Sequence, residues 1–310
     1  MEIIPLSELD YFDYIQISGD DARSFLQGQV TCNVDLLSQQ RSLVGALCNL
    51  KGRVIADFRL LSVHDDEILL QTLSGNGQII IETLSRYAVF SKVELQLTDG
   101  PTAAFGVIGE SVEAAFQEVA CHFPESENGV LCSEDFVSIR VAGSKPRYQL
   151  WCRNQQALTA VRRLDVMEEQ ATLVAWQRAD IEAGIVHVDA QSSERYTPQL
   201  LNYDISGAVD FNKGCYTGQE VVARMHYRAT AKKRMFRLRS AVSIDTDSSI
   251  ASASAAEQAV AEVLSSIPAS ENGLNSEALA ILSTELAASN PQLVLAGEKV
   301  ELVELTYPVE

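Results

Sequence analysis

The chain has 310 residues, of which 46% are hydrophobic and 21% charged, and its formal net charge is −18. This length allows two or three domains with a substantial core, and the charge opposes general binding to nucleic acid, which needs a basic face. Aliphatic runs such as Ile79–Ile81 are too short to span a bilayer, and the first residues lack the basic region of a signal peptide. We therefore expect a cytoplasmic protein with no membrane partner.

Alternating apolar and polar residues in the first hundred positions predict strands joined by short turns. Lys51-Gly52 supplies one such turn. Strands are expected at Asp13–Ser18, Leu43–Asn49, Arg53–Val63, Glu67–Thr72 and Val93–Leu97, and helices at Ala22–Gly28 and Gln78–Ala88.

The segment from residue 103 to residue 168 follows the order β-α-β-β-α, which is typical of a small ferredoxin-like module. No residue in it has an evident chemical role. Its expected strands are Ala104–Ile108, Val137–Val141 and Arg147–Cys152, and its expected helices are Ser111–Ala120 and Gln155–Met167.

The expected helix Thr172–Gly184 contains the run W-x-x-x-x-I-E-A-G, with Trp176 and Glu182. A tryptophan at helical spacing is more often part of a core than of a binding site. His187 and Asp189 follow on a short expected strand, and we interpret both as structural. The polar, turn-rich stretch Gln191–Gly207 is predicted to be a loop.

The residue types in the stretch Phe211–Arg228, FNKGCYTGQEVVARMHYR, indicate a chemical role more than a role in packing. A thiol at Cys215, near the ammonium of Lys213 and ahead of a helix N-terminus, is expected to ionise more easily than a free cysteine. Thr217 and Glu220 form a T-x-x-E pattern, which predicts a capping box. The alternative is a glycine turn with a buried, inert cysteine.

The six cysteines include no C-x-x-C pair and no cluster with histidine. This argues against a structural zinc site or a resident iron–sulfur cluster, so we expect no bound metal and free thiols in a reducing compartment. They are Cys32, Cys48, Cys121, Cys132, Cys152 and Cys215.

Basic residues are concentrated just after the cysteine motif. Seven of the 24 lysines and arginines fall between Arg224 and Arg239, with no acid among them. We expect a local anion site, suited to carboxylates or to a few phosphates, and the alternative is a solvated strand face. The basic residues are Arg224, Arg228, Lys232, Lys233, Arg234, Arg237 and Arg239.

The last seventy residues differ in character from the rest. Ser243–Ala256 is of low complexity and is predicted to be a flexible linker. Strands are possible at Ala259–Ile267, Ala278–Thr284 and Lys299–Thr306, although the composition of Glu277–Ala288 favours a helix.

The run K-G-C-Y-T-G-Q-E followed by V-V-A-R resembles the signature of the YgfZ family, folate-binding proteins similar to the aminomethyltransferase (T-protein) of the glycine cleavage system. The likeness extends from about Leu9 to Arg239. It implies an α+β, multi-domain T-protein-like fold with a ferredoxin-like module and a small C-terminal β-barrel. The implied domains are a folate-binding core at 1–100 and 169–230, the module at 103–168, and the barrel at 231–310 with its linker near 243–256.

The resemblance also implies a ligand and a role. The ligand is tetrahydrofolate or a derivative, and the role is support of iron–sulfur cluster assembly or repair in enzymes such as those that thiolate tRNA. Folate contacts are implied for Phe12, Trp176, Glu182, Gln219 and Arg228. Cys215, assisted by Lys213, would face the folate and carry out a one-carbon or thiol transfer, if there is turnover at all.

A second hypothesis is a tetrahydrofolate-dependent aminomethyltransferase. Those enzymes have a pair of acids after the turn glycine, where this chain has Ala56-Asp57. We take the incomplete pair as evidence against aminomethyl transfer and interpret Asp57 as a solvent-facing strand residue. A third hypothesis, a thiol redox protein, is disfavoured because Cys215 has no second cysteine near it in sequence.

Overall fold

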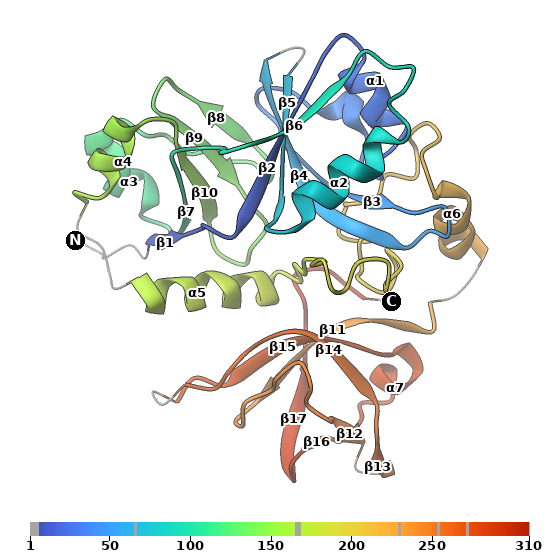
Figure 1. Ribbon diagram of the computed structural model, residues 1–310. Helices are drawn as coiled ribbons and strands as arrows, with labels where there is room; N and C mark the ends of the chain where they lie inside the picture. Colours follow the sequence, from blue (N-terminus) through green and yellow to red (C-terminus); the bar gives the residue numbers. More distant parts are fainter. Residues whose placement is uncertain are drawn as a thin grey trace.

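The computed structural model describes residues 6–64, 67–164, 169–228, 231–252, 255–270 and 273–309. The described residues form three antiparallel β-sheets, and Figure 1 shows two of them side by side above the third. Helix α5 (Glu169–Glu182) runs between the upper pair and the lower sheet. Within these residues no helix is long and apolar enough to cross a membrane.

The first sheet has the strand order β3-β4-β5-β2-β6 and confirms the strands predicted in the first hundred residues. Apolar residues at every second position cover one face and form a core with two helices. The elements are β2 (Phe12–Ser18), α1 (Ala22–Gln27), the 3₁₀ helix η1 (Val34–Leu36), β3 (Leu43–Cys48), β4 (Val54–His64), β5 (Glu67–Leu73), α2 (Asn76–Ser85) and β6 (Glu94–Thr98).

The second sheet has the order β1-β7-β10-β9-β8, so the predicted module takes its edge strand β1 from the N-terminal end of the chain. Residues 165–168, where the last predicted helix of the module would end, lie outside the described residues. The elements are β1 (Leu6–Glu8), β7 (Ala103–Ile108), α3 (Val112–Phe116), the 3₁₀ helix η2 (Gln117–Val119), β8 (Val130–Cys132), β9 (Phe136–Arg140), β10 (Arg147–Cys152) and α4 (Gln155–Val161).

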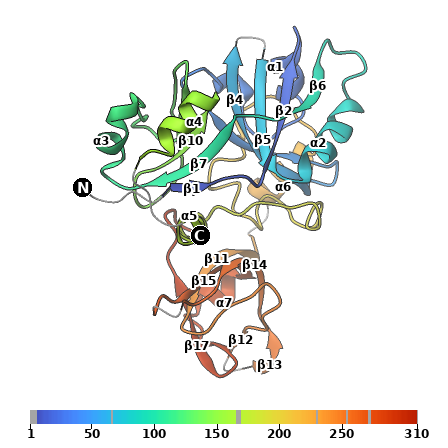
Figure 2. The same cartoon turned by 60° about the vertical axis from the view of Figure 1, so that its left-hand side comes forward.

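The third sheet, of seven strands, curls around its own core below α5 (Figures 1 and 2). Strand β15 is buried almost throughout, and this tertiary burial outweighs the helical propensity of its sequence. The elements are β11 (Lys233–Ser240), β12 (Ala251–Ser252), β13 (Ala255–Ala259), β14 (Ala261–Ile267), β15 (Ser276–Ser283), α7 (Thr284–Ala288), β16 (Leu293–Leu295) and β17 (Glu298–Val303).

The predicted flexible linker at Ser243–Ala256 is wrong for the part that the structure describes. Ile244 and Ile250 are fully buried in the core of the third sheet. The N–H of Ile244 donates a hydrogen bond to the hydroxyl of Ser276, and β12 and β13 continue the sheet. The low-complexity composition hides two apolar anchors, which hold the segment in place.

Candidate functional site

A cavity of about 460 Å³ lies where the first sheet, the second sheet and the end of α5 meet. The C-terminal tail, the segment after β17, also lines it with Thr306 and Tyr307. This volume is within the usual range for small-molecule sites. Its wall combines aromatic rings with charged side chains. The residues used below are Phe12, Asp57, Arg59, Arg147, Gln149, Trp176, Asp180, His187, Tyr203 and Tyr307.

Trp176 lies in the cavity wall but is not a bare stacking surface. Its side chain is 2% exposed, and the guanidinium of Arg147 lies 4.0 Å from the centre of the ring. A Cβ added at Gly106 would come within 2.3 Å of the ring, so the module's strand β7 packs tightly against it. The tryptophan therefore helps to join α5 to the second sheet as well as to line the cavity.

Arg147 is the most deeply buried charge of the site. It is 1% exposed, and its Nη2 donates to Oδ1 of Asp180 on α5. Its Nε and Nη1 and the side-chain oxygen of Gln149 are buried without a hydrogen-bond partner among the described residues. Buried polar groups without partners are costly, so these atoms are suited to a ligand that offers both acceptors and donors. A cavity role for the module was missed, because nothing in its sequence distinguishes Arg147.

A second arginine, Arg59 of β4, is also buried in the same wall. Its guanidinium donates to the hydroxyl of Ser42 at 2.7 Å and to the side-chain oxygen of Asn128 at 2.8 Å. Burial lowers the pKa of Arg59 to about 10, which still leaves it charged at neutral pH. The cavity wall thus carries two buried arginines, which stand beside the acids Asp57, Glu127 and Asp180.

Asp57 is not a solvent-facing strand residue, as its position in the sequence led us to expect. Its Oδ2 lies 2.5 Å from Nδ1 of His187, and its Oδ1 accepts the backbone N–H of Val188 at 2.7 Å. Among the described residues, the segment that carries His187 belongs to no helix or strand. Burial alone would lower the pKa of His187, but the carboxylate of Asp57 outweighs it and the pKa is raised.

Phe12 is placed in the cavity wall, and its ring lies edge-on to His187 with the ring centres 6.1 Å apart. Glu182 is not among the lining residues. Its carboxylate is 3.3 Å from Nη2 of Arg237 and accepts the hydroxyl of Ser144 at 3.4 Å. The structure therefore brings Phe12 and Trp176 to the cavity, whereas Glu182 joins the end of α5 to the third sheet.

The C-terminal tail completes the wall, which the sequence did not indicate. The hydroxyl of Tyr307 donates to the carbonyl of Gly184 at 3.1 Å. Gly184 has φ +67°, a left-handed conformation that suits glycine, and it ends α5 as predicted. A Cβ at this position would lie 2.4 Å from the Tyr307 hydroxyl.

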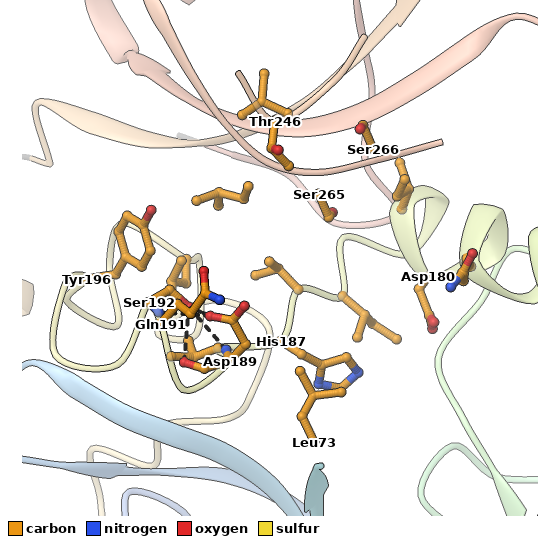
Figure 3. A pocket seen from close by; sticks show the side chains of 18 of the residues that line it. Leu73, Asp180, His187, Asp189, Gln191, Ser192, Tyr196, Thr246, Ser265 and Ser266 are labelled. Carbon is orange, nitrogen blue, oxygen red and sulfur yellow. Dashed lines mark hydrogen bonds between the residues drawn. The ribbon is translucent and has the colours of Figure 1, made fainter. Parts of the chain in front are cut away.

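A second pocket of about 620 Å³ adjoins the cavity on the side of the third sheet (Figure 3). Figure 3 shows Asp180 and His187 at one side of it and Ser265, Ser266 and Thr246 across from Asp189 and Ser192. Asp180 and His187 line both spaces, together with Ile185 and Val186.

The structure corrects the expected placement of the cysteine motif. Cys215 is exposed and is not among the cavity-lining residues. The ammonium of Lys213 is buried and donates to the carbonyls of Val30 at 2.6 Å and Cys32 at 2.7 Å, which turns it inward and leaves the thiol outside. Burial lowers the pKa of Lys213 from 10.5 to about 8. Both contacts of the Lys213 ammonium hold the backbone after α1 in place, and neither involves the Cys215 thiol.

The capping box predicted in the same motif is also wrong. Helix α6 (Gln219–Arg228) begins after Gly218, and the hydroxyl of Thr217 donates to Oε1 of Gln29 at 2.9 Å. Oε1 of Gln219 accepts the N–H of Tyr216 at 3.3 Å, so this side chain caps its own turn. Gln219 is not among the residues that line the cavity.

Three arginines of the basic run are paired with acids and are therefore not free to form the expected anion site. Arg234 makes two hydrogen bonds to the carboxylate of Asp204, and Arg237 and Arg239 both donate to Glu277. These acids come from other segments, so the local charge count in the sequence was misleading. The side chain of Arg228 lies outside the described part of the structure.

Comparisons with known proteins agree with this architecture. Residues 4–213 match the family model described as the GCVT N-terminal domain. A "tRNA-modifying protein YgfZ" of Colwellia psychrerythraea is 33% identical over 236 residues, which are 76% of this chain and 71% of the relative. A protein of the same name from Hamiltonella defensa is 30% identical over 231 residues, 74% of this chain and 68% of the relative.

Among solved structures, the glycine cleavage system aminomethyltransferase T from Bartonella henselae aligns with a TM-score of 0.79. The alignment covers 98% of this chain and 86% of that protein, at 14% sequence identity. At 14% sequence identity the match shows a shared fold and does not show a shared function. It extends through the C-terminal seventy residues, where the sequence likeness fades.

Proposed function

The chain belongs to the YgfZ family, and from this premise we propose that it binds a reduced folate in the central cavity and supports tRNA modification. The observation that carries the proposal is a cavity of about 460 Å³ in which aromatic rings stand beside buried polar atoms without partners. The tRNA-modifying role comes from the names of the two relatives.

The residues of the cavity fit a tetrahydrofolate-type ligand. A reduced pteridine is a flat heterocycle that presents both hydrogen-bond donors and acceptors, and its glutamyl tail is anionic. Arg147 offers donors and Gln149 an acceptor, while Phe12 and Trp176 offer apolar ring surface. Arg59 and Arg147 add positive charge to the cavity wall, whereas Arg234 and Arg237 of the basic run are paired with acids.

We propose that the folate-loaded protein acts in the cytoplasm on iron–sulfur enzymes, among them enzymes that thiolate tRNA. In this proposal Cys215 reacts with a protein partner and not with the ligand of the cavity. An exposed thiol can be reached by a protein partner, whereas a ligand in the cavity does not meet it. Whether a one-carbon unit or a sulfur is transferred depends on that partner.

Folate binding is tested by titrating the protein with 5-formyltetrahydrofolate and following tryptophan fluorescence. Phe12→Ala should weaken binding by about 1–3 kcal/mol, the scale of a lost aromatic contact. Phe90→Ala is the matched control, because Phe90 is fully exposed and does not line the cavity. Equal affinities for the two variants and the wild type would remove Phe12 from the site.

The tryptophan signal needs its own control, since Trp151 is the second tryptophan of the chain. Trp151 packs edge-on against Tyr14, with ring centres 5.5 Å apart, and does not line the cavity. Trp176→Phe should therefore remove most of the quenching and Trp151→Phe should retain it. Quenching that follows Trp151 would contradict the cavity as the binding site.

The cellular role is tested by complementation in cells that lack the protein. Cys215→Ser keeps the size of the side chain and removes most of its nucleophilicity, so it should fail to restore the activity of iron–sulfur enzymes. Cys132→Ser, at the other exposed cysteine, should complement fully. Full complementation by Cys215→Ser would refute a chemical role for this thiol.

Aminomethyl transfer is the alternative function, and the directions of the side chains at positions 56 and 57 are compatible with it. Ala56 points away from the cavity into the core of the first sheet, whereas Asp57 lies in the cavity wall. The missing acid at position 56 thus removes no carboxylate from the cavity. A glycine-cleavage assay with lipoylated carrier protein decides, because only an aminomethyltransferase would show activity.

A further inference from the structure

His187 lies where the two hollow spaces of the molecule meet. It lines the central cavity and also the adjoining pocket, where Figure 3 shows its ring beside Leu73. Its side chain is 32% exposed, so the ring is accessible although its backbone segment is held in place. Asp189 and Gln191, at the rim of the adjoining pocket, are exposed, so this pocket opens to solvent.

Asp57 fixes the orientation of the imidazole. One carboxylate oxygen meets Nδ1 at 2.5 Å, and the other accepts the N–H of the next residue, Val188, at 2.7 Å. Two contacts to adjacent parts of one segment hold the ring in one position and keep a proton on Nδ1. Within the described ranges Nε2 has no hydrogen-bond partner, so it is the nitrogen left to exchange a proton.

The charges around the ring favour the imidazolium. Asp57 and, less strongly, Asp180 raise the pKa of His187, while burial and Arg59 lower it, and the net direction is upward from 6.5. Tyr203, which also faces this region, donates its hydroxyl to the carbonyl of Val186. Arg147 is paired with Asp180, which reduces the influence of that acid on the ring.

We propose that His187 is the proton-transfer residue of this site, exchanging a proton at Nε2 with the ligand of the cavity and renewing it from solvent through the adjoining pocket. The identity of the ligand rests on the proposed function and is a reduced folate, with a ring nitrogen as proton acceptor. On donation the imidazolium becomes a neutral imidazole, which keeps its proton on Nδ1 and donates it in a hydrogen bond to Asp57. The ligand nitrogen gains the proton and the positive charge, so no other reactant is needed.

The first readout requires no ligand. In ¹⁵N NMR of the free protein, His187 should titrate at Nε2 with a pKa above 6.5, and the pKa should fall in Asp57→Asn. His187→Gln identifies the resonance among the four histidines. A ring that fails to titrate between about pH 5 and 9, or that titrates unchanged in Asp57→Asn, would overturn the proposal.

The second readout is proton linkage on binding of 5-methyltetrahydrofolate, measured by calorimetry in buffers of different ionisation enthalpy. The wild type should take up or release up to one proton, and its affinity should change by up to about tenfold per pH unit across the titration of His187. His187→Gln, which keeps a hydrogen-bond donor near Nε2 but cannot be protonated, should lose the linkage. His226→Gln is the matched control, because His226 stacks on Phe211 outside the cavity.

The two readouts separate the two claims. Folate binding with unchanged proton linkage in His187→Gln would overturn the role of His187 and leave the folate site intact. Absence of folate binding by the wild type would refute the ligand, whereas the expected NMR titration would still support a proton-exchanging residue at this position.

Discussion

The ion pair between Arg147 and Asp180 should contribute strongly to stability, because it joins the second sheet to α5 inside the cavity wall. The arginine side chain is 1% exposed and that of the aspartate 17%. Arg147→Met keeps most of the side-chain volume and leaves the Asp180 carboxylate without its partner. Removing one member of a buried pair costs about 3–5 kcal/mol, and the partial exposure of Asp180 places the expected loss near the lower end.

The magnitude of the coupling follows from the same geometry. Asp180→Asn should cost about 2–3 kcal/mol, because it leaves the buried guanidinium over Trp176 without a counter-charge. The double variant has no charge left to strand. It should therefore lose clearly less than the sum of the single changes, with a coupling energy of about 2–3 kcal/mol.

Urea unfolding followed by far-UV circular dichroism gives the three free-energy differences, provided that the slopes agree among the variants. Lys145→Met is a suitable control, because Lys145 lies in the same hairpin and is exposed, and it should change stability by less than about 0.5 kcal/mol. Additive losses in the double variant would show that the two side chains act independently and would refute the pair as described.

Three further predictions concern the turn after α5, the histidine pair and the thiols. Gly184→Ala should destabilise the protein by about 3 kcal/mol or more, because a clash with the hydroxyl of Tyr307 adds to the cost of the left-handed backbone. Gly207→Ala is the control, since this position has φ +88° and open space around it. It should cost only about 1–2 kcal/mol in the same unfolding assay. Because the pKa of His187 is raised on folding, its pairing with Asp57 contributes stability that is fully present below pH 6.5 and is lost as the pH rises through the folded-state pKa. Asp57→Asn should remove this pH dependence from thermal unfolding curves. An unchanged profile would contradict the pairing. Iodoacetamide should modify Cys215 in the native protein well before the four buried cysteines, and mass spectrometry of the peptides would show any buried site that reacts first.

The local elements could be predicted because each depends on residues close together in sequence. Alternation at period two identified the strands of the first sheet, and helical spacing with a stop at Gly184 identified α5. The family likeness added what pattern alone could not, because it singled out Trp176 and Phe12, which both line the central cavity. It also implied that Cys215 would face the folate, whereas the thiol is exposed and does not line the cavity, since an eight-residue motif does not specify which way its loop faces.

Only the tertiary structure decided which charged groups meet. Asp57 and His187 are 130 residues apart, and Arg147 meets Asp180 across 33 residues and two different elements. The arginines that follow the cysteine motif look unpaired in sequence because their partners, Asp204 and Glu277, come from other segments. Electrostatic interactions depend on distance and burial in space, and neither can be obtained from spacing along the chain. For this reason the sequence determined the elements and the family, whereas the packing of distant segments determined the chemistry of the cavity.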